Sequence, residues 1–283
     1  MLPLNVSFWG PRTVDRPSWA PTEVDVTRPS VARVYDYYLG GSHNFASDRA
    51  FAREVLQVYP ELTAISRDNR DFLRRAVLYL CSQGIDQFLD LGSGIPTVGN
   101  VHEVAQTVNP RARVVYVDHD PVAVTHSREL LSGTDGVVAI QADLREPERV
   151  IQLAVAVGDL DLTRPVAVLM VSVLHFVGDE QHPAELVAQY MSAMARGSYV
   201  ALSHARSDGK RDAAATEQVY NRSRSPNPMQ FRSTAEIGSL FGDLTVIDPG
   251  VVHLPSWRPE LGEDADPDVG EDYPALAGVG RRD

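Results

Sequence analysis

The chain reads FLDLGSGIPT from Phe88 to Thr97, and this stretch decides its fold. An apolar run ends at an acid and passes into a Gly-x-Gly turn, after which a helix is predicted to begin near Thr97. Because glycine lacks a Cβ, Gly92 and Gly94 can adopt positive φ and let a ligand lie against bare backbone. A strand that leads into such a turn and a helix is typical of the nucleotide-binding edge of an open α/β sheet.

Acids end the next two predicted strands as well, and this pattern is more specific than the glycines. The apolar run 113–117 is followed by Asp118, and the run 137–142 is followed by Asp143. Asp118 lies roughly 20 residues past the glycines, where an acid can accept hydrogen bonds from both hydroxyls of a ribose. Asp90, Asp118 and Asp143 are therefore predicted to lie along one edge of the sheet, as parts of a nucleotide site.

Composition and charge limit the partners. The 283 residues carry a formal net charge of −12. Because contacts to nucleic-acid phosphates need a basic surface, this charge disfavours DNA or RNA as the main partner and favours a small molecule. Cys81 is the single cysteine, no Cys/His cluster has zinc-ligand spacing, and no signal peptide or long apolar run is present. We expect a cytoplasmic protein with no metal site and no membrane partner.

The alternation of predicted strands and helices indicates an α/β fold with a doubly wound, mostly parallel sheet. Asp120 is predicted to cap a helix that begins with Pro121, because proline is favoured at the first helical position. Five strands come first and two follow without long crossover helices, which makes seven. These strands are expected at 87–91, 113–118, 137–142, 165–173, 197–203, 244–247 and 276–280.

The chain divides into three predicted parts. Residues 1–27 form an irregular arm, whose Trp9 and Trp19 either dock, for example on a neighbouring subunit of a homodimer, or belong to a flexible tail. Residues 28–84 are expected to form a helical lid over the carboxyl edge of the sheet, and residues 85–283 the nucleotide-binding core. The helical patterns of the lid cover 30–39, 48–59, which Asp48 can cap, and 62–83.

These motifs resemble those of class I S-adenosylmethionine (SAM)-dependent methyltransferases, which share a seven-stranded Rossmann-like sheet. The segment Asp90–Gly94 resembles their first motif, Asp118 resembles their ribose acid, and the pair Asp143-Leu144 resembles the residues beside the adenine. The segment Val171–Phe176 resembles the fourth motif of the enzymes that act on small molecules.

Four longer segments resemble one bacterial family, the S-adenosyl methyltransferase family, which was formerly catalogued as a domain of unknown function. The resemblance covers about Pro29 to Arg282, and it implies SAM as the cofactor and S-adenosylhomocysteine (SAH) as its product. It leaves the acceptor unassigned. The segments are Val34–Phe45, Asn69–Ala76, Pro96–Ala105 and Val173–Val177.

The resemblance also implies roles for individual residues. At the first motif, Gly92, Ser93 and Gly94 would line the methionine and ribose, and Asp90 would organise the turn or meet the amino group. Further along, Asp118 would bind the ribose hydroxyls, His119 would pack beside the nucleoside, Asp143 and Leu144 would lie at the adenine edge, and Ser172 would belong to the fourth motif. The alternative for Asp143 is a helix cap near Pro147. From the lid, Tyr38, Gly41, Asn44 and Arg70 would close over the methionine end, where Arg70 can pair with a carboxylate.

Two departures from the general methyltransferase motifs stand out, and the second bears on the acceptor. Pro96 stands where the general motif has its third glycine, and no Asn/Asp-Pro-Pro-Tyr sequence occurs at 171–176, which disfavours DNA and amide-nitrogen acceptors. His175 is the candidate general base, because it follows the fourth strand and histidine titrates near neutral pH. A buried histidine satisfied by backbone groups is the alternative, and His43 and His204 are further candidates for the base.

The predicted function is SAM-dependent methyl transfer to a small-molecule acceptor. A NAD-dependent oxidoreductase is an alternative, but Thr97 stands in place of the third fingerprint glycine and no Tyr-x-x-x-Lys occurs in a suitable place. A non-catalytic module that binds SAM is a second alternative, since it would keep the same binding motifs.

Overall fold

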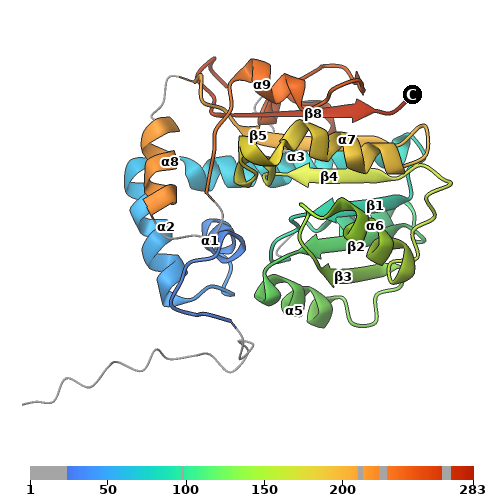
Figure 1. Cartoon of the computed structure of the whole chain (residues 1–283), viewed down its shortest axis with the longest axis horizontal. Helices are drawn as coiled ribbons and strands as arrows, with labels where there is room; N and C mark the ends of the chain where they lie inside the picture. The colour runs from blue at the N-terminus through green and yellow to red at the C-terminus, as the bar shows by residue number, and fades with distance from the viewer. Residues whose placement is uncertain (1–23, 97–98, 210–212, 223–227, 263–268) are drawn as a thin grey trace, which may run out of the picture.

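The structure is a computed structural model that describes residues 24–96, 99–209, 213–222, 228–262 and 269–283. Trp9 and Trp19 lie outside the described residues, so the docking arm and the homodimer stay predictions. A single sheet runs through the molecule in the order β3-β2-β1-β4-β5-β8-β6, and β7 pairs with β8 (Figure 1).

The first five strands are parallel, and the last three are antiparallel to their neighbours. The parallel strands are β1 (Gln87–Leu91), β2 (Arg113–Asp118), β3 (Val137–Gln141), β4 (Ala167–Val171) and β5 (Tyr199–Ala205). β8 (Ala275–Arg281) pairs with β5, and β6 (Thr245–Val246) and β7 (Val252–His253) pair with β8. The predicted doubly wound, mostly parallel sheet is confirmed. The structure adds β7, because two residues are too short to leave a periodic pattern.

Helices cover both faces of this sheet. The side chains of β1 alternate between the two apolar layers, with Leu89 packed on one face and Phe88 on the other. On the Leu89 face lie α6 (Pro147–Ala156), α7 (Pro183–Ala193) and α9 (Thr234–Ser239); on the Phe88 face lie α3 (Leu62–Ser82), α4 (Val101–Val108) and α5 (Pro121–Leu130). A parallel sheet buried on both faces explains the nearly continuous apolar runs in the sequence.

The predicted helix starts are partly correct. Asp120 caps α5 as expected, since its Oδ1 accepts hydrogen bonds from the amides of Val122 at 2.7 Å and Ala123 at 3.4 Å. Asp48 does not cap α2 (Ala46–Val58), because the helix begins two residues earlier and Asp48 lies in its first turn. There its Oδ2 accepts a hydrogen bond from the amide of Phe45 at 2.7 Å.

A helical layer covers the carboxyl ends of the parallel strands. It contains α1 (Val31–Tyr38), α2, the first half of α3 and α8 (Ala213–Arg222), which lie together at the left of Figure 1. Tyr38, Phe51 and Tyr220 share one apolar cluster, so α8 joins the lid from the far end of the sequence. Because α3 runs from this lid onto the sheet, lid and core share one continuous helix.

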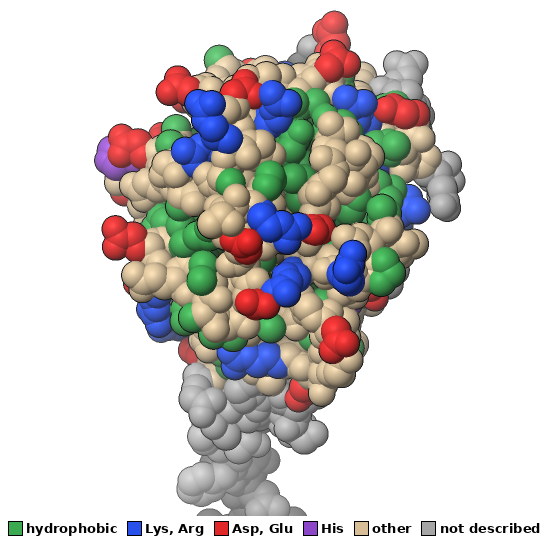
Figure 2. Space-filling view, turned by 90° about the vertical axis from the view of Figure 1, so that its right-hand side faces the viewer, with side chains coloured by type: hydrophobic (Ala, Val, Ile, Leu, Met, Phe, Trp, Pro, Cys, Tyr) green, Lys and Arg blue, Asp and Glu red, His purple; other side chains and the backbone are tan. Residues whose placement is uncertain are grey.

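The opposite edge, at the amino ends of the parallel strands, carries no concentrated charge. Figure 2 shows acidic and basic side chains interspersed across this face. The ion pairs Arg164–Asp86 and Arg281–Asp283 lie at this edge.

Candidate functional site

A deep pocket lies between the lid and the carboxyl ends of β1, β2, β3, β4 and β5. In an open α/β sheet this edge is the ordinary ligand site, at the point where the strand order reverses. Here the order reverses between β1 and β4, and the pocket extends to both sides of that point. We name its two parts after the roles that the sequence leads us to expect: the part along β1, β2 and β3 is the cofactor end, and the part along β4, β5 and α8 is the acceptor end.

The glycine turn after β1 forms the floor of the cofactor end. Gly92 has φ +71°, and a Cβ there would lie 2.3 Å from Cγ2 of Val173, so only glycine fits. Gly94 has φ +66°, and a Cβ there would meet nothing within 4 Å. The space above Gly94 is therefore open, as a ligand that lies against the backbone requires.

Asp118 faces this turn from the end of β2. Its Oδ2 accepts a hydrogen bond from the Gly94 amide at 2.8 Å, and its Oδ1 accepts one from the Asp120 amide at 2.8 Å. A carboxylate offers about four acceptor positions, so two backbone bonds leave room for two hydroxyl groups. Burial raises the pKa of Asp118, against the opposing effect of His119, whose Nδ1 lies 3.5 Å from Oδ1.

Asp90, at the end of β1, is buried beside Asp118 and Arg70. Burial raises the pKa of Asp90 to about 7, the charge of Arg70 opposes this shift, and the Asp118 carboxylate adds to it. Arg70 projects from α3 and donates a hydrogen bond from Nη2 to the carbonyl of Gly99 at 3.2 Å. A carboxyl group and a guanidinium group thus lie at the same end of the pocket, where they could pair with the ammonium and the carboxylate of an amino acid.

Asp143 follows β3 and is held by Arg145. The guanidinium Nε donates to Oδ1 at 2.9 Å and to Oδ2 at 3.0 Å, and Nη2 donates to Oδ2 at 2.5 Å. Burial raises the pKa of Asp143, but the hydrogen bonds and charge of Arg145 outweigh it, so the pKa is lowered. Asp143 does not accept a bond from the helix near Pro147, whose first turn is not capped by a side chain.

The pocket brings together most of the residues that the sequence indicates. Gly41, His43 and Asn44 are the exceptions: they do not line it, because they build the turn after α1 around Asp36. Nδ2 of Asn44 donates to Oδ2 of Asp36 at 2.7 Å, and a Cβ on Gly41 would lie 1.9 Å from Oδ1 of Asp36. The predicted residues that do line the pocket are Tyr38, Arg70, Asp90, Gly92, Ser93, Gly94, Asp118, His119, Asp143, Leu144, Ser172 and His175.

A buried ion cluster that sequence reasoning missed fastens the lid beside Asp118. Arg33 of α1 donates from Nε to Oδ2 of Asp48 at 2.9 Å and from Nη1 to Oδ2 of Asp120 at 3.1 Å. Ser30 donates its hydroxyl to the same oxygen of Asp120. The available signal was an arginine between the buried residues Ala32 and Val34, since an arginine is almost never fully buried without a partner.

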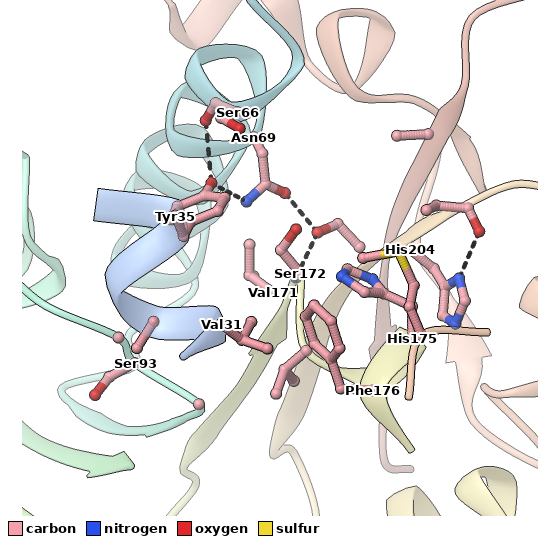
Figure 3. Close-up of a pocket in the computed structure, with 18 of the residues that line it drawn as sticks. Val31, Tyr35, Ser66, Asn69, Ser93, Val171, Ser172, His175, Phe176 and His204 are labelled. Atoms are coloured by element: carbon pink, nitrogen blue, oxygen red, sulfur yellow. Dashed lines mark hydrogen bonds between the residues drawn. The ribbon is translucent and has the colours of Figure 1, made fainter. Parts of the chain in front are cut away.

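A chain of hydrogen bonds crosses the middle of the pocket and ties the lid to the sheet (Figure 3). The amide of Ser172, which has φ +59°, donates to Oγ of Ser203 at 2.9 Å, and that hydroxyl donates to Oδ1 of Asn69 at 2.6 Å. Nδ2 of Asn69 donates to the Tyr35 hydroxyl at 3.0 Å, which donates to the carbonyl of Ser66 at 3.1 Å. Ser172 thus contributes to the pocket through its backbone.

Aromatic side chains and a methionine dominate the acceptor end. The hydroxyls of Tyr38 and Tyr220 lie 3.4 Å apart, and the rings of Phe176 and Tyr220 lie 6.2 Å apart. Tyr59, Met229 and Phe231 complete this lining. α8 and the segment after it therefore form a wall that the motifs did not reveal.

Two histidines lie at this end, and their environments differ. The guanidinium of Arg232 can only donate, so Nε2 of His204, 2.9 Å from its Nη1, accepts, and Nδ1 carries the proton toward the Ala205 carbonyl at 2.7 Å. Burial lowers the pKa of His204 to about 4. His175 has a fully buried Nδ1 with no hydrogen-bond partner among the described residues.

Arg232 also fixes the segment that carries His175. It donates from Nη1 to the carbonyl of Leu174 at 3.0 Å and from Nη2 to that of Val177 at 2.8 Å. Asp179 forms an ion pair with Arg232, with Oδ1 2.8 Å from Nη2. The two hydrogen bonds to carbonyls fix both ends of the short helix η1 (Leu174–Phe176). Burial, together with His204 and the charge of Arg232, places the pKa of His175 well below its usual value.

Within the described ranges, no group of three or more His, Cys, Asp or Glu side chains could hold a metal ion. The same residues contain no helix that is long and apolar enough to cross a bilayer.

Comparisons with known proteins agree on one family. The family model described as S-adenosyl methyltransferase matches residues 17–283. A crystal structure of a candidate methyltransferase from Thermobifida fusca YX is 38% identical, covers 94% of this chain and 99% of its own, and superposes with a TM-score of 0.85. A DUF574 family protein from Streptomyces avermitilis MA-4680 is 34% identical over 92% of this chain and 99% of its own, also with a TM-score of 0.85. A comparison with curated protein sequences found no match.

Proposed function

The chain belongs to the S-adenosyl methyltransferase family, and from this premise we propose that its pocket holds SAM at the cofactor end and a small-molecule acceptor at the acceptor end. It is a SAM-dependent methyltransferase, and its product from the cofactor is SAH. When bound, SAM supplies a methyl group on a sulfonium, which leaves as a neutral thioether. The chain's own task is to bind, orient and exclude water.

The observation that carries this proposal is the position of Asp90, Asp118 and Asp143 on three adjacent strand ends around one cavity. In this proposal Asp118 would bind the ribose hydroxyls, and Asp143 with Leu144 would lie at the adenine edge. Asp90 and Arg70 would hold the ammonium and carboxylate of the methionine part. The open space above Gly94 fits a ligand of this kind, since no side chain fills it.

A calorimetric titration of the protein with SAM, SAH and NAD tests the cofactor assignment. We expect SAM and SAH to bind and NAD not to bind, because Thr97 replaces the glycine that the dinucleotide fingerprint needs. Binding of NAD without SAM or SAH would overturn the assignment. Neither alternative function is favoured by the family or by the similar structures.

The finer proposals concern the acceptor. The net charge of −12 and a site enclosed between lid and sheet support a small molecule over a nucleic acid. Formation of SAH from SAM in the presence of an acceptor separates an enzyme from a non-catalytic SAM-binding module. Failure to form SAH with a broad panel of small-molecule acceptors would support the module.

A further inference from the structure

The acceptor end of the pocket is uncharged in the part of the chain that the structure describes. All the Asp, Glu, Lys and Arg residues that line the pocket lie at the cofactor end; they are Arg70, Asp90, Asp118, Asp143 and Arg145. At the acceptor end, an ammonium or carboxylate group of the acceptor would lose its hydration, and no described side chain of opposite charge lines that end to compensate for the loss. Burial of an uncompensated charge is strongly unfavourable, so the lining selects against charged acceptors.

The side chains at this end suit a flat apolar body. Tyr38 approaches from α1, Tyr220 from α8 and Phe176 from η1, while Met229 and Phe231 add a polarizable thioether and a further ring. Aromatic rings pack with each other in stacked and edge-to-face arrangements, and methionine sulfur favours ring edges. An aromatic acceptor therefore gains contacts that an aliphatic chain of the same volume would not.

Among the described residues at this end, His175 is the one with a buried side-chain nitrogen, Nδ1, that has no hydrogen-bond partner. An unpaired buried polar nitrogen is destabilising, and native proteins tolerate few of them. His204, 5.5 Å away between ring centroids, shows the ordinary solution, with both nitrogens bonded. His175 instead stands in the pocket beside Phe176, on a segment that Arg232 holds in place (Figure 3).

We propose that the acceptor is an uncharged aromatic small molecule whose phenolic hydroxyl faces His175, and that His175 takes the proton of this hydroxyl during methyl transfer. This inference rests on the proposed function, because the methyl donor must lie at the cofactor end of the same cavity.

The atoms and charges of the step balance. The acceptor oxygen gives its proton to Nε2 of His175, the ring nitrogen other than the fully buried Nδ1, and forms a bond to the methyl carbon. The carbon–sulfur bond breaks, and its electron pair goes to sulfur. One positive charge is lost at the sulfonium as one appears on the imidazole, so the net charge of the closed pocket does not change. The imidazolium then releases its proton to water.

Matched naphthalenes test the acceptor class. The SAH complex of the full chain is titrated with 2-naphthol, 2-naphthoate and 2-(aminomethyl)naphthalene, which are neutral, anionic and cationic. We expect 2-naphthol to bind and the charged analogues to bind at least about tenfold more weakly, because their charges lose hydration. Failure to bind SAH in the first place overturns the proposed function. Binding of SAH with equal or better affinity for a charged analogue overturns the acceptor class alone.

Phenols of different acidity test the role of His175. The rate of SAH formation from SAM is measured at about pH 8 with 4-ethylphenol, which keeps its proton, and with 4-nitrophenol, which is largely ionised. For His175→Asn we expect a loss of about 100-fold or more with 4-ethylphenol, as removal of a general base predicts, and a much smaller loss with 4-nitrophenol.

Equal losses with both phenols would show that His175 only positions the acceptor, and no SAH from the wild type with either phenol would overturn the step. The affinity of the variant for SAH, which the cofactor end controls, is expected to equal that of the wild type and reports its fold. If His175→Asn loses SAH binding, His175→Gln is measured in the same way.

Discussion

The two ends of the pocket differ in the charge and the hydrogen bonding of the side chains that line them. At the cofactor end, Asp118 accepts a hydrogen bond from the Gly94 amide and Asp143 accepts hydrogen bonds from Arg145. At the acceptor end the described lining is uncharged and aromatic, and the Nδ1 atom of His175 has no partner. The first arrangement suits a charged ligand, as the proposed function requires. The second is poorly suited to a charged ligand, and the proton acceptor that we propose there is Nε2 of His175.

The difference also separates what binds from what reacts. A cofactor is held by many directional bonds, and removal of any one of them weakens affinity. Methyl transfer itself depends mainly on the alignment of the reacting atoms and on a group that takes the proton of the acceptor. Variants at the cofactor end should therefore change SAH affinity, and variants at the acceptor end should change acceptor affinity or rate while SAH binding stays intact.

The largest expected effect is at Asp118. Asp118→Ala removes two charge-assisted hydrogen bonds to the ribose, worth about 1.5–3 kcal/mol each, so we expect SAH affinity to fall by about 100-fold to 10,000-fold. Calorimetry with SAH measures this loss. Asp118→Asn keeps the size of the side chain and one oxygen, so its affinity for SAH should lie between those of the wild type and of Asp118→Ala. An alanine variant that binds SAH as tightly as the wild type would remove the cofactor end from the account.

Arg33 should give the next largest effect, on stability. Arg33→Met leaves the buried carboxylates of Asp48 and Asp120 without their cation, and breaking a buried pair in this way costs about 3–5 kcal/mol. Urea denaturation gives the free energy of unfolding. The exposed Arg53 on α2 is the matched control, and Arg53→Met should change it by less than about 0.5 kcal/mol. Equal small changes in both would mean that the cluster does not hold the lid.

Asp90 should make SAH binding depend on pH. With a pKa of about 7 in the ligand-free protein, Asp90 is mostly protonated below neutrality, and a protonated acid cannot pair with the methionine ammonium. Binding must then release a proton, so affinity should rise by up to about tenfold per pH unit as pH approaches 7, and level off above it. Calorimetry between about pH 5.5 and 8 measures this. Asp90→Asn should flatten the profile, and a flat wild-type profile would contradict the role of Asp90.

The smallest effect is expected at Phe231. Phe231→Ala removes one aromatic contact, worth about 0.5–1.5 kcal/mol, and should weaken binding of 2-naphthol to the SAH complex by about tenfold or less. The affinity for SAH alone should stay the same, which sets this variant against Asp118→Ala. If Phe231→Ala weakened SAH and left 2-naphthol unchanged, the division of the pocket into two ends would be wrong.

The sequence predicts the cofactor end well, because its parts are local. A strand, a glycine turn and a strand-end acid are each written in a few consecutive residues, and parallel strands bring their ends together without further information. Even here one cause was not local. Position 92 must be glycine because a Cβ there would clash with Val173, which follows the neighbouring strand β4. The motif itself does not reveal this contact.

The acceptor end could not be predicted, because its residues meet only in the folded chain. Tyr38 and Tyr220 touch across 182 positions of sequence, and neither carries a pattern that distinguishes a pocket wall from an ordinary core residue. The same holds for Arg33 and Asp120, 87 positions apart. Gly41 and Asn44 show the reverse case, since family motifs suggested a ligand and the structure places them around Asp36.

A crystal structure of the SAH complex tests the division of the pocket most directly. The account predicts the ribose hydroxyls within hydrogen-bond distance of Asp118, the adenine beside Asp143 and Leu144, and the sulfur facing the space between His175 and Tyr220. An SAH molecule that placed its sulfur away from His175, or its charged groups among Tyr38, Tyr220 and Phe231, would contradict it.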